Sequence, residues 1–287
     1  MEQPIPRIAA IHSLAGFGRS SLAVIIPTLS AMGIQVCPIP TAVLSTHTGG
    51  LGEVEMRDLT NYIHPCVEHY KRLGLEFSCI YSGFLSNPSQ AKEVSEFIQA
   101  YPGALAVVDP VMGDHGKPYR TYTAELMEQM RGLVGSADLI TPNPTEAYLL
   151  LRRSYTPEPL TRQSLRSMLA QLGELGPKYV VITGVELASG GCANVGYAKE
   201  QNNFWMVPYD YVPTSYPGTG DIFASVLTGS MLRGDSFPIA MDRATQFVEL
   251  AIKTTFSYGT DTRYGVMLER CLAWLPQTEV LTNYQLL

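Results

Sequence analysis

The sequence predicts an α/β protein with a central, mostly parallel sheet that is covered by helices on both faces. Short β-branched runs alternate with helical patterns along the chain, which is the order of elements in parallel-sheet proteins. Several of those runs are apolar throughout, as strands buried on both faces are. The 287 residues show no repeat, low-complexity tract or linker-like change in composition, so we expect residues 1–287 to form a single domain.

The expected elements follow one another in chain order. Strands are expected at residues 7–11, 35–37, 41–44, 77–81, 105–108, 138–140 and 179–182, with a hairpin of strands at 195–197 and 204–207. Helices are expected at 20–32, 54–73 (with interruptions), 88–101 and 160–175, and the pattern is mostly helical from 219 onward. Pro88 suits the first helical position, because the N–H that proline lacks would have no helical partner there.

Composition and charge exclude several classes of protein. Hydrophobic residues make up 46% of the chain, which is enough for a sizeable core. There are 20 Lys and Arg against 26 Asp and Glu, a net charge of −6 with no basic block, so we expect neither a nucleic acid nor an anionic membrane as partner. The five cysteines are scattered and form no CxxC pair, which indicates a reducing compartment. The chain also starts without a signal-like apolar segment, so we expect the cytoplasm.

Small or polar residues follow nearly every expected strand. Because ligands bind beyond the carboxyl ends of parallel strands, these residues are the first candidates for a site. They are His12-Ser13, 45–48, Ser82-Gly83, Asp109, 141–143 and Thr183-Gly184. Ordinary turn chemistry would explain about half of them, but not an Asp-Pro pair directly after four buried residues.

The segment 217–221, PGTGD, stands immediately before a predicted helix. Two glycines let the backbone approach a ligand closely, and the first N–H groups of a helix have no partner within it. Together they would bind an anion at the positive end of the helix dipole. Asp221 opens that helix, where a carboxylate could accept the proton of an alcohol as a P–O bond forms. On spacing alone, a glycine-rich loop with an ordinary Asp cap is an equal alternative.

The segment GTGDIFASVLTG resembles the C-terminal signature of the ribokinase-like superfamily of small-molecule kinases. Further segments, in the same order along the chain, resemble the pyridoxal (pyridoxine/pyridoxamine) kinase family. They are IAAIHSLAGFGRSSL, VLSTHTGG, IYSGFLSNPSQ, DPVMGDHGKPY and TPNPTEAYLL. The resemblance implies a ribokinase-like fold and the ATP-dependent phosphorylation of the 5′-hydroxymethyl group of pyridoxal, pyridoxamine or pyridoxine. It also implies Mg²⁺ and a homodimer, and leaves open a monovalent cation such as K⁺.

The resemblance assigns roles to individual residues. It makes Asp221 the catalytic base and places the transferring phosphoryl group in an anion hole of Gly218, Thr219 and Gly220. It places Mg²⁺ binding at Asp109 and Glu146, and nucleotide binding at Asn143, Thr183 and Gly184. It puts vitamer binding at Ser13, His47, Thr48, Tyr81 and Phe84. Several family members have a lysine near the strand that ends here at 181–184, and this chain has none.

Other interpretations of the same residues stay open. Ser13 would also suit a turn cap, His47 a hydrogen-bonded loop histidine, and Glu146 a partner of the dipole of a helix that begins near Pro144. Residues 209–217 suit a flap over the substrates or a plain connection. Two other functions also fit: a hydroxymethylpyrimidine kinase of the same superfamily, and a vitamin-binding relative that has lost turnover.

Overall fold

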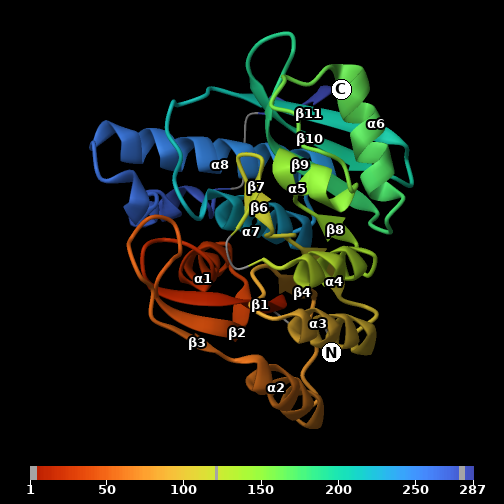
Figure 1. Ribbon diagram of the computed structural model, residues 1–287, viewed down its shortest axis with the longest axis vertical. Coiled ribbons are helices and arrows are strands. Elements are labelled where there is room, and N and C mark those ends of the chain that lie inside the picture. The colour runs from red at the N-terminus through yellow and green to blue at the C-terminus, as the bar shows by residue number, and fades with distance from the viewer. Residues whose placement is uncertain (1–4, 120–121, 278–281) are drawn as a thin grey trace.

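A single sheet runs through the computed structural model, which describes residues 5–119, 122–277 and 282–287 (Figure 1). In the described part of the chain it has ten strands. In sheet order they are β12 (Gln285–Leu286), β11 (Asn203–Tyr209), β10 (Cys192–Ala198), β9 (Tyr179–Glu186), β8 (Leu139–Ile140), β5 (Leu105–Val108), β4 (Cys79–Ser82), β1 (Arg7–Phe17), β2 (Gln35–Thr46) and β3 (Met56–Asp58). The six strands from β9 to β2 are parallel, and antiparallel strands flank them. The predicted mostly parallel sheet is confirmed.

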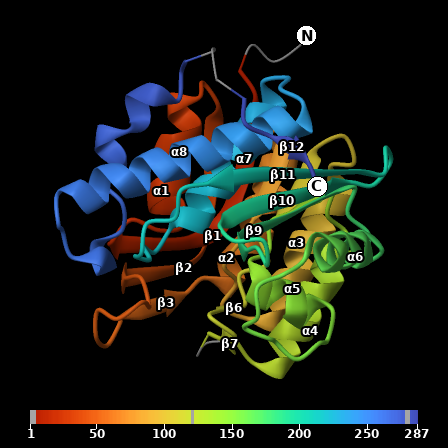
Figure 2. The same cartoon turned by 90° about the horizontal axis from the view of Figure 1, so that it is seen from above.

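Helices cover both faces of the sheet, as the sequence predicts (Figure 2). One face carries α1 (Leu22–Ala31), α7 (Thr219–Leu232) and α8 (Phe237–Ser257). The other carries α2 (Thr60–Arg72), α3 (Pro88–Ala100), α4 (Ala124–Val134), α5 (Pro144–Leu150) and α6 (Arg162–Gly173). A separate hydrophobic core lies on each side, because alternate residues of each strand point to opposite faces. In the parts of the chain that the structure covers, no helix is both long and apolar enough to cross a membrane.

Some expected elements differ from those observed. The two short strands at 35–37 and 41–44 are one strand, β2, although Pro38 and Pro40 lie within it. The prolines are tolerated because β3 pairs only with Ala42–Leu44, so the prolines lie on the part of β2 that has no strand on its outer side. The predicted helix at 54–73 is wrong in its first turn, since β3 occupies part of that segment and α2 begins at Thr60.

Two further segments differ from the prediction. Helix α4 was not among the expected elements, although Thr123 caps it and its buried residues, Leu126, Met130 and Leu133, have helical spacing. After α8 the chain forms short 3₁₀ turns at Thr262–Tyr264, Leu268–Arg270 and Leu272–Trp274, where a mostly helical pattern was expected. The sequence therefore missed one helix and overestimated the helical content after α8.

The strand order locates the place where a ligand can enter. Strand β1 has β2 on one side and β4 on the other. The chain goes from β1 to β2 on one side and later returns to β4 on the other, so the strand order reverses at β1. The crevice outside the carboxyl ends of strands at such a reversal is the usual binding position in open α/β sheets. A small hairpin of β6 (Gly113–Asp114) and β7 (Lys117–Pro118) follows β5 at the same edge.

Candidate active site

The N-terminus of α7 is built around Gly218. This residue is the N-cap and has a φ of 83°, in the left-handed region that favours glycine. A Cβ at this position would lie 2.1 Å from the carbonyl oxygen of Arg19, so the loop after β1 can pack directly against the turn only if residue 218 is glycine. The first hydrogen bond of the helix runs from Ile222 N–H to Gly218 O over 3.0 Å, which leaves the preceding N–H groups outside the helical ladder.

Asp221 lies in the first turn of α7 with 9% of its surface exposed. The backbone N–H of Ser21 donates to its Oδ2 over 2.7 Å. On the other side, His12 Nε2 lies 3.0 Å from Oδ1. The carboxylate is therefore held between the middle of β1, the segment that follows β1 and the start of α7. His12 was expected as a polar residue after a strand at 7–11, but β1 extends to Phe17 and His12 lies within it. Its contact with Asp221 depends on packing between residues that are far apart in the sequence.

Two cavities meet at the α7 N-terminus. The first, of about 180 Å³, is lined by Ser13, His47, Thr48 and Phe84 together with Gly218 and Asp221, and we call it the Ser13 cavity. The second, of about 200 Å³, is lined by Thr183 and Gly184 together with Thr219 and Gly220, and we call it the Thr183 cavity. Successive residues of one turn thus face different cavities, with Gly218 and Asp221 on one side and Thr219 and Gly220 on the other.

The Ser13 cavity contains most of the residues that were predicted to bind the vitamer. Ser13 Oγ donates to Ser21 Oγ over 3.0 Å, so its hydroxyl already has one partner. The His47 ring is occupied on both sides: Gly49 N–H donates to Nδ1 over 3.0 Å, and Nε2 donates to the carbonyl of Arg263 over 2.6 Å. His47 therefore fixes its loop through backbone contacts. Tyr81 is 1% exposed, belongs to the hydrophobic core and lines neither cavity.

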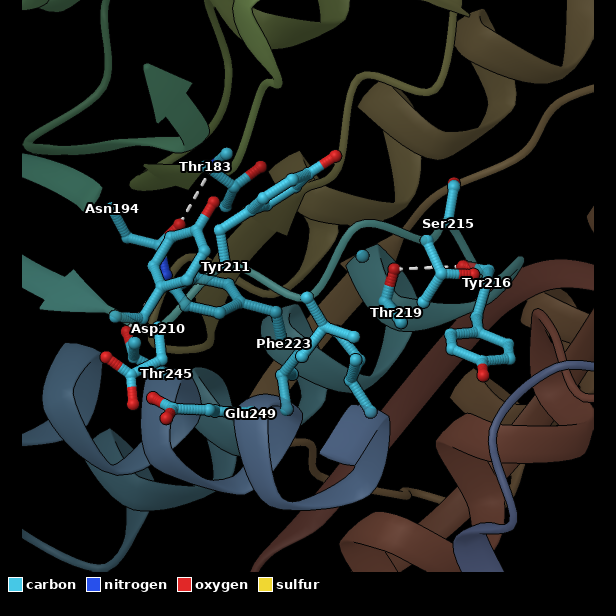
Figure 3. A pocket seen from close by; sticks show the side chains of 17 residues that line it. Thr183, Asn194, Asp210, Tyr211, Ser215, Tyr216, Thr219, Phe223, Thr245 and Glu249 are labelled. Atoms are coloured by element: carbon cyan, nitrogen blue, oxygen red, sulfur yellow. Dashed lines mark hydrogen bonds between the residues drawn. The ribbon is translucent and has the colours of Figure 1, made fainter. Parts of the chain in front are cut away.

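The Thr183 cavity extends from Thr219 at one end to a polar group of residues at the other (Figure 3). The Thr219 hydroxyl donates to Tyr216 O over 3.1 Å. At the far end, Asn194 Oδ1 accepts from Gly184 N–H over 2.9 Å. Residues 209–216 form one wall, so the proposed flap segment belongs to this cavity. Sequence reasoning did not single out Asn194, because it stands within a strand and not after one.

Two carboxylates at the polar end of this cavity were also missed from the sequence. Asp210 and Glu249 both line the cavity, and both are bound by the ammonium of Lys253, with Nζ 2.8 Å from Asp210 Oδ2. Lys253 therefore offsets the negative charge at the end of the cavity that lies opposite Thr219. The sequence signal was weak, because Glu249 and Lys253 form an i,i+4 pair like those on many solvated helix faces.

Asp109 and Glu146 are buried carboxylates, 6% and 4% exposed. Burial, and then the charge of Asp221, raise the pKa of Asp109 to about 8, although the Thr141 hydroxyl acts in the opposite direction. Burial and the charge of Asp109 raise the pKa of Glu146 well above its usual range, despite N–H groups that donate to it from Met112 and Asn143.

Asn143 is occupied by the backbone around it. It is the N-cap of α5, with Oδ1 accepting from Glu146 N–H over 3.0 Å and Nδ2 donating to Gly113 O over 2.8 Å. Glu146 completes a capping box with it, so the helix-capping interpretation of Glu146 is confirmed. Asn143 lines neither cavity.

The same region fits a divalent cation that is shared with a ligand. In residues 5–119, 122–277 and 282–287, no group of three or more His, Cys, Asp or Glu side chains could hold a metal alone. Mg²⁺, however, is usually held by one or two carboxylates together with water and phosphate oxygens. The charges of these two buried carboxylates repel each other, and a divalent cation would offset that repulsion. The hydroxyl of Ser82, whose carbonyl accepts from Asp109 N–H, is also buried and has no partner among the described residues.

The parallel sheet, the crevice at β1 and a glycine-rich helix N-terminus between two cavities define a ribokinase-like α/β protein. Comparison with known proteins agrees. The family described as phosphomethylpyrimidine kinase matches residues 26–265. The pyridoxine/pyridoxal/pyridoxamine kinase of Bordetella bronchiseptica is 25% identical over 266 residues, which cover 89% of this chain and 92% of that protein.

Solved structures are similar over almost the whole chain. A Bacteroides thetaiotaomicron protein assigned to the phosphomethylpyrimidine kinases, in a crystal form with pyridoxal, is 42% identical with a TM-score of 0.94, and the match covers 99% of this chain and 100% of that one. Pyridoxal kinase from Lactobacillus plantarum is 31% identical with a TM-score of 0.85, over 95% of this chain and 97% of that one. The chain belongs to the family of phosphomethylpyrimidine and pyridoxal kinases.

Proposed function

We propose that this protein transfers the γ-phosphoryl group of ATP to the 5′-hydroxymethyl group of pyridoxal, pyridoxamine or pyridoxine. The observation that carries the proposal is the α7 N-terminus, which offers Gly218 and Asp221 to one cavity and Thr219 and Gly220 to the other. A kinase needs this arrangement, because its two substrates must meet at one phosphoryl group. The relatives support the choice of substrate, since they are named for B6 vitamers and one was crystallised with pyridoxal.

In this proposal the vitamer binds in the Ser13 cavity. Ser13 and Thr48 would bind the polar atoms of the pyridine ring, and Phe84 would pack against the ring. Asp221 accepts the proton of the hydroxymethyl group while its oxygen forms a bond to the γ-phosphorus. The bond between the γ-phosphorus and the bridging oxygen breaks, and ADP leaves with that oxygen. Ser21 N–H donates to Oδ2 of the carboxylate, so in this proposal Oδ1 would take the proton.

The nucleotide binds in the Thr183 cavity, with its phosphates toward the α7 N-terminus. The N–H groups of Gly218, Thr219 and Gly220 stabilise the charge of the transferring group. Asp109 and Glu146 would hold the Mg²⁺ that neutralises the phosphates, a need that is greater in a chain of net charge −6. We assign Asn143 a supporting role, as the cap that holds Glu146 in place.

The function is tested by ADP release coupled to a spectrophotometric assay. The acceptors are pyridoxal, pyridoxine, pyridoxamine and hydroxymethylpyrimidine, with Asp221→Asn as the blank. We expect turnover with at least one B6 vitamer at a rate well above that with hydroxymethylpyrimidine. Hydroxymethylpyrimidine is the second candidate substrate, because the matching family is named for a kinase of a related pyrimidine, phosphomethylpyrimidine. Turnover with that acceptor alone would replace the proposed substrate, and turnover with none would support a vitamin-binding protein.

We also propose that residues 1–287 act as one kinase domain, as a homodimer in the cytoplasm, with stimulation by K⁺. The family resemblance supports the dimer and the cation, and the cysteine pattern supports a reducing compartment. Sedimentation equilibrium tests the dimer. Activity in K⁺ and in tetramethylammonium salts of equal ionic strength tests the cation.

A further inference from the structure

We propose that His12 is a positioning residue, which holds the Asp221 carboxylate in the orientation that takes the proton from the acceptor alcohol. The inference rests on the proposed function, because it concerns the general base of that reaction. His12 lies in the middle of β1, where the pairing with β2 shifts in register, and it also lines the Ser13 cavity. Neither the sequence motifs nor the resemblance gave it a role.

The His12 ring is fixed on three sides. It is 2% exposed, and the backbone N–H of Ser13 donates to its Nδ1 over 2.9 Å. Nδ1 is therefore an acceptor, and the neutral ring carries its proton on Nε2. Gly83 makes room for the ring, because a Cβ there would lie 2.1 Å from His12 Cδ2. Phe84 stacks on the ring with centroids 6.5 Å apart and an angle of 26° between the planes.

The protonated nitrogen of this fixed ring faces Asp221. Nε2 lies 3.0 Å from Asp221 Oδ1, while Ser21 N–H donates to Oδ2. The contact is close but not aligned as a hydrogen bond, and Nε2 has no hydrogen-bond partner elsewhere in the described chain. A buried N–H without a hydrogen-bond partner destabilises the fold. Because the His12 Nε2–H lies beside Asp221 Oδ1 despite this cost, we infer that its role is to hold that carboxylate.

The chemistry of the carboxylate explains why such a group is useful. A general base must point a lone pair at the proton that it removes, and a free carboxylate rotates about its χ2 angle. The hydrogen bond from Ser21 to Oδ2 and the close packing of the fixed His12 ring against Oδ1 together restrict that rotation. The restriction lowers the barrier without contact between His12 and the alcohol, so the loss of His12 should affect kcat more than either KM.

Two substitutions of His12 test the contacts of Nδ1 and of Nε2 separately. His12→Asn places an amide oxygen near the Nδ1 position, so it can still accept from Ser13 N–H, but nothing reaches Asp221. His12→Gln places an amide N–H near the Nε2 position. We expect His12→Asn to lower kcat about tenfold or more, with the KM values for pyridoxal and ATP changed less than about twofold, and His12→Gln to recover most of the loss. His69→Asn, on the exposed face of α2, is the matched control.

The decisive comparison repeats His12→Asn in the Asp221→Asn background. Because His12 acts through Asp221, we expect almost no further loss of kcat there. An equal loss in both backgrounds, an unchanged kcat in the single variant, or a raised KM for pyridoxal at constant kcat would each overturn the positioning role. The last result would make His12 a substrate-binding residue.

A second measurement does not depend on turnover or on the folding of His12 variants. In ¹⁵N-histidine-labelled protein, Asp221→Asn should shift the Nε2 resonance of one protonated ring, assigned to His12, and leave the other four histidines in place. An unshifted resonance would overturn the contact. If the wild-type protein phosphorylates none of the acceptor alcohols, the proposed function fails, whereas loss of the kcat effect alone would reject only the role of His12.

Discussion

The Ser13 cavity and the Thr183 cavity have similar volumes, about 180 and 200 Å³, but different walls. The Ser13 cavity is enclosed by side chains that the backbone holds in place, such as His12, His47 and Asp221. The Thr183 cavity is bounded by a connecting segment, 209–216, in which Tyr211 is 65% exposed. In the proposed function, the side chains around the acceptor alcohol are therefore held more tightly than the wall of the nucleotide cavity, and the nucleotide would be bound mainly by backbone N–H groups and Mg²⁺.

The largest effect should come from the residue between the two cavities. Asp221→Asn keeps the shape of the side chain but cannot accept a proton, so kcat should fall by about 10²–10⁴-fold. Both KM values should change little, because neither cavity loses its walls. Steady-state kinetics with saturating substrates measure this, and a loss of less than about tenfold would remove Asp221 as the base.

The two glycines of the turn should differ from each other. Gly218→Ala places a Cβ 2.1 Å from Arg19 O at a φ of 83°, so we expect loss of most activity and a lower Tm, on the order of 1–3 kcal/mol in the free energy of unfolding. At Gly220 a Cβ meets no atom within 4 Å among the described residues. Gly220→Ala should therefore keep the Tm and change only the KM for ATP. Equal losses of Tm in the two variants would show that the turn is not held by the contact with Arg19.

Substitutions in the two walls should affect different substrates. Ser13→Ala and Thr48→Val should raise the KM for the vitamer several-fold, because each removes a hydroxyl that in the proposal would pair with a polar atom of the ligand, at about 1–3 kcal/mol. Thr183→Val and Glu249→Gln should raise the KM for ATP by a similar factor. Isothermal titration with pyridoxal and with ATP, beside a melting curve, measures this. A turn cap at Ser13 would instead lower the Tm and leave both affinities intact.

A further prediction concerns pH and Asp109. Its pKa is 3.8 when unperturbed and is raised to about 8 in the folded protein, so between these pH values the folded state holds a proton that the unfolded state has released. The contribution of Asp109 to stability is thus complete below about pH 4 and is lost as the pH rises toward 8. In EDTA, the Tm of Asp109→Asn minus the wild-type Tm should therefore rise from pH 5 to pH 8. A constant difference between the two Tm values would contradict the raised pKa.

The metal assignment can be tested with the same residues. Glu146→Gln should raise the Mg²⁺ concentration needed for half-maximal rate, because the acidic chain needs a cation at the phosphates. Titration of the rate with Mg²⁺ at fixed ATP measures this, with Glu125→Gln in the first turn of α4 as the matched control. If neither Glu146→Gln nor Asp109→Asn changes the metal dependence, both residues are structural.

The sequence predicted those features that depend on neighbouring residues. The buried strands follow from β-branched runs, and the α7 turn follows from two glycines and an aspartate within four positions. Helix α4 was missed although its pattern was present, and β2 was divided at Pro38 and Pro40 because proline normally ends a strand unless no strand lies on its outer side.

The contacts of the site were harder to predict, because they join distant parts of the chain. His12 meets Asp221 across more than 200 residues, and nothing local to either residue shows it. His47 was given two interpretations, beside a substrate or as a loop histidine. Its ring nitrogens bind the backbone of Gly49 and Arg263, and the residue also lines the Ser13 cavity. Tyr81 has the right position in the sequence, but the alternation of the strand turns its side chain into the core on the α7 face.

A crystal structure with pyridoxal and a non-hydrolysable ATP analogue tests most directly whether the α7 turn separates two substrates. We expect the pyridine ring in the Ser13 cavity, its hydroxymethyl oxygen within hydrogen-bond distance of Asp221, and the terminal phosphate at the N–H groups of Gly218, Thr219 and Gly220. Pyridoxal in the Thr183 cavity, or both ligands on the same side of the turn, would contradict this arrangement.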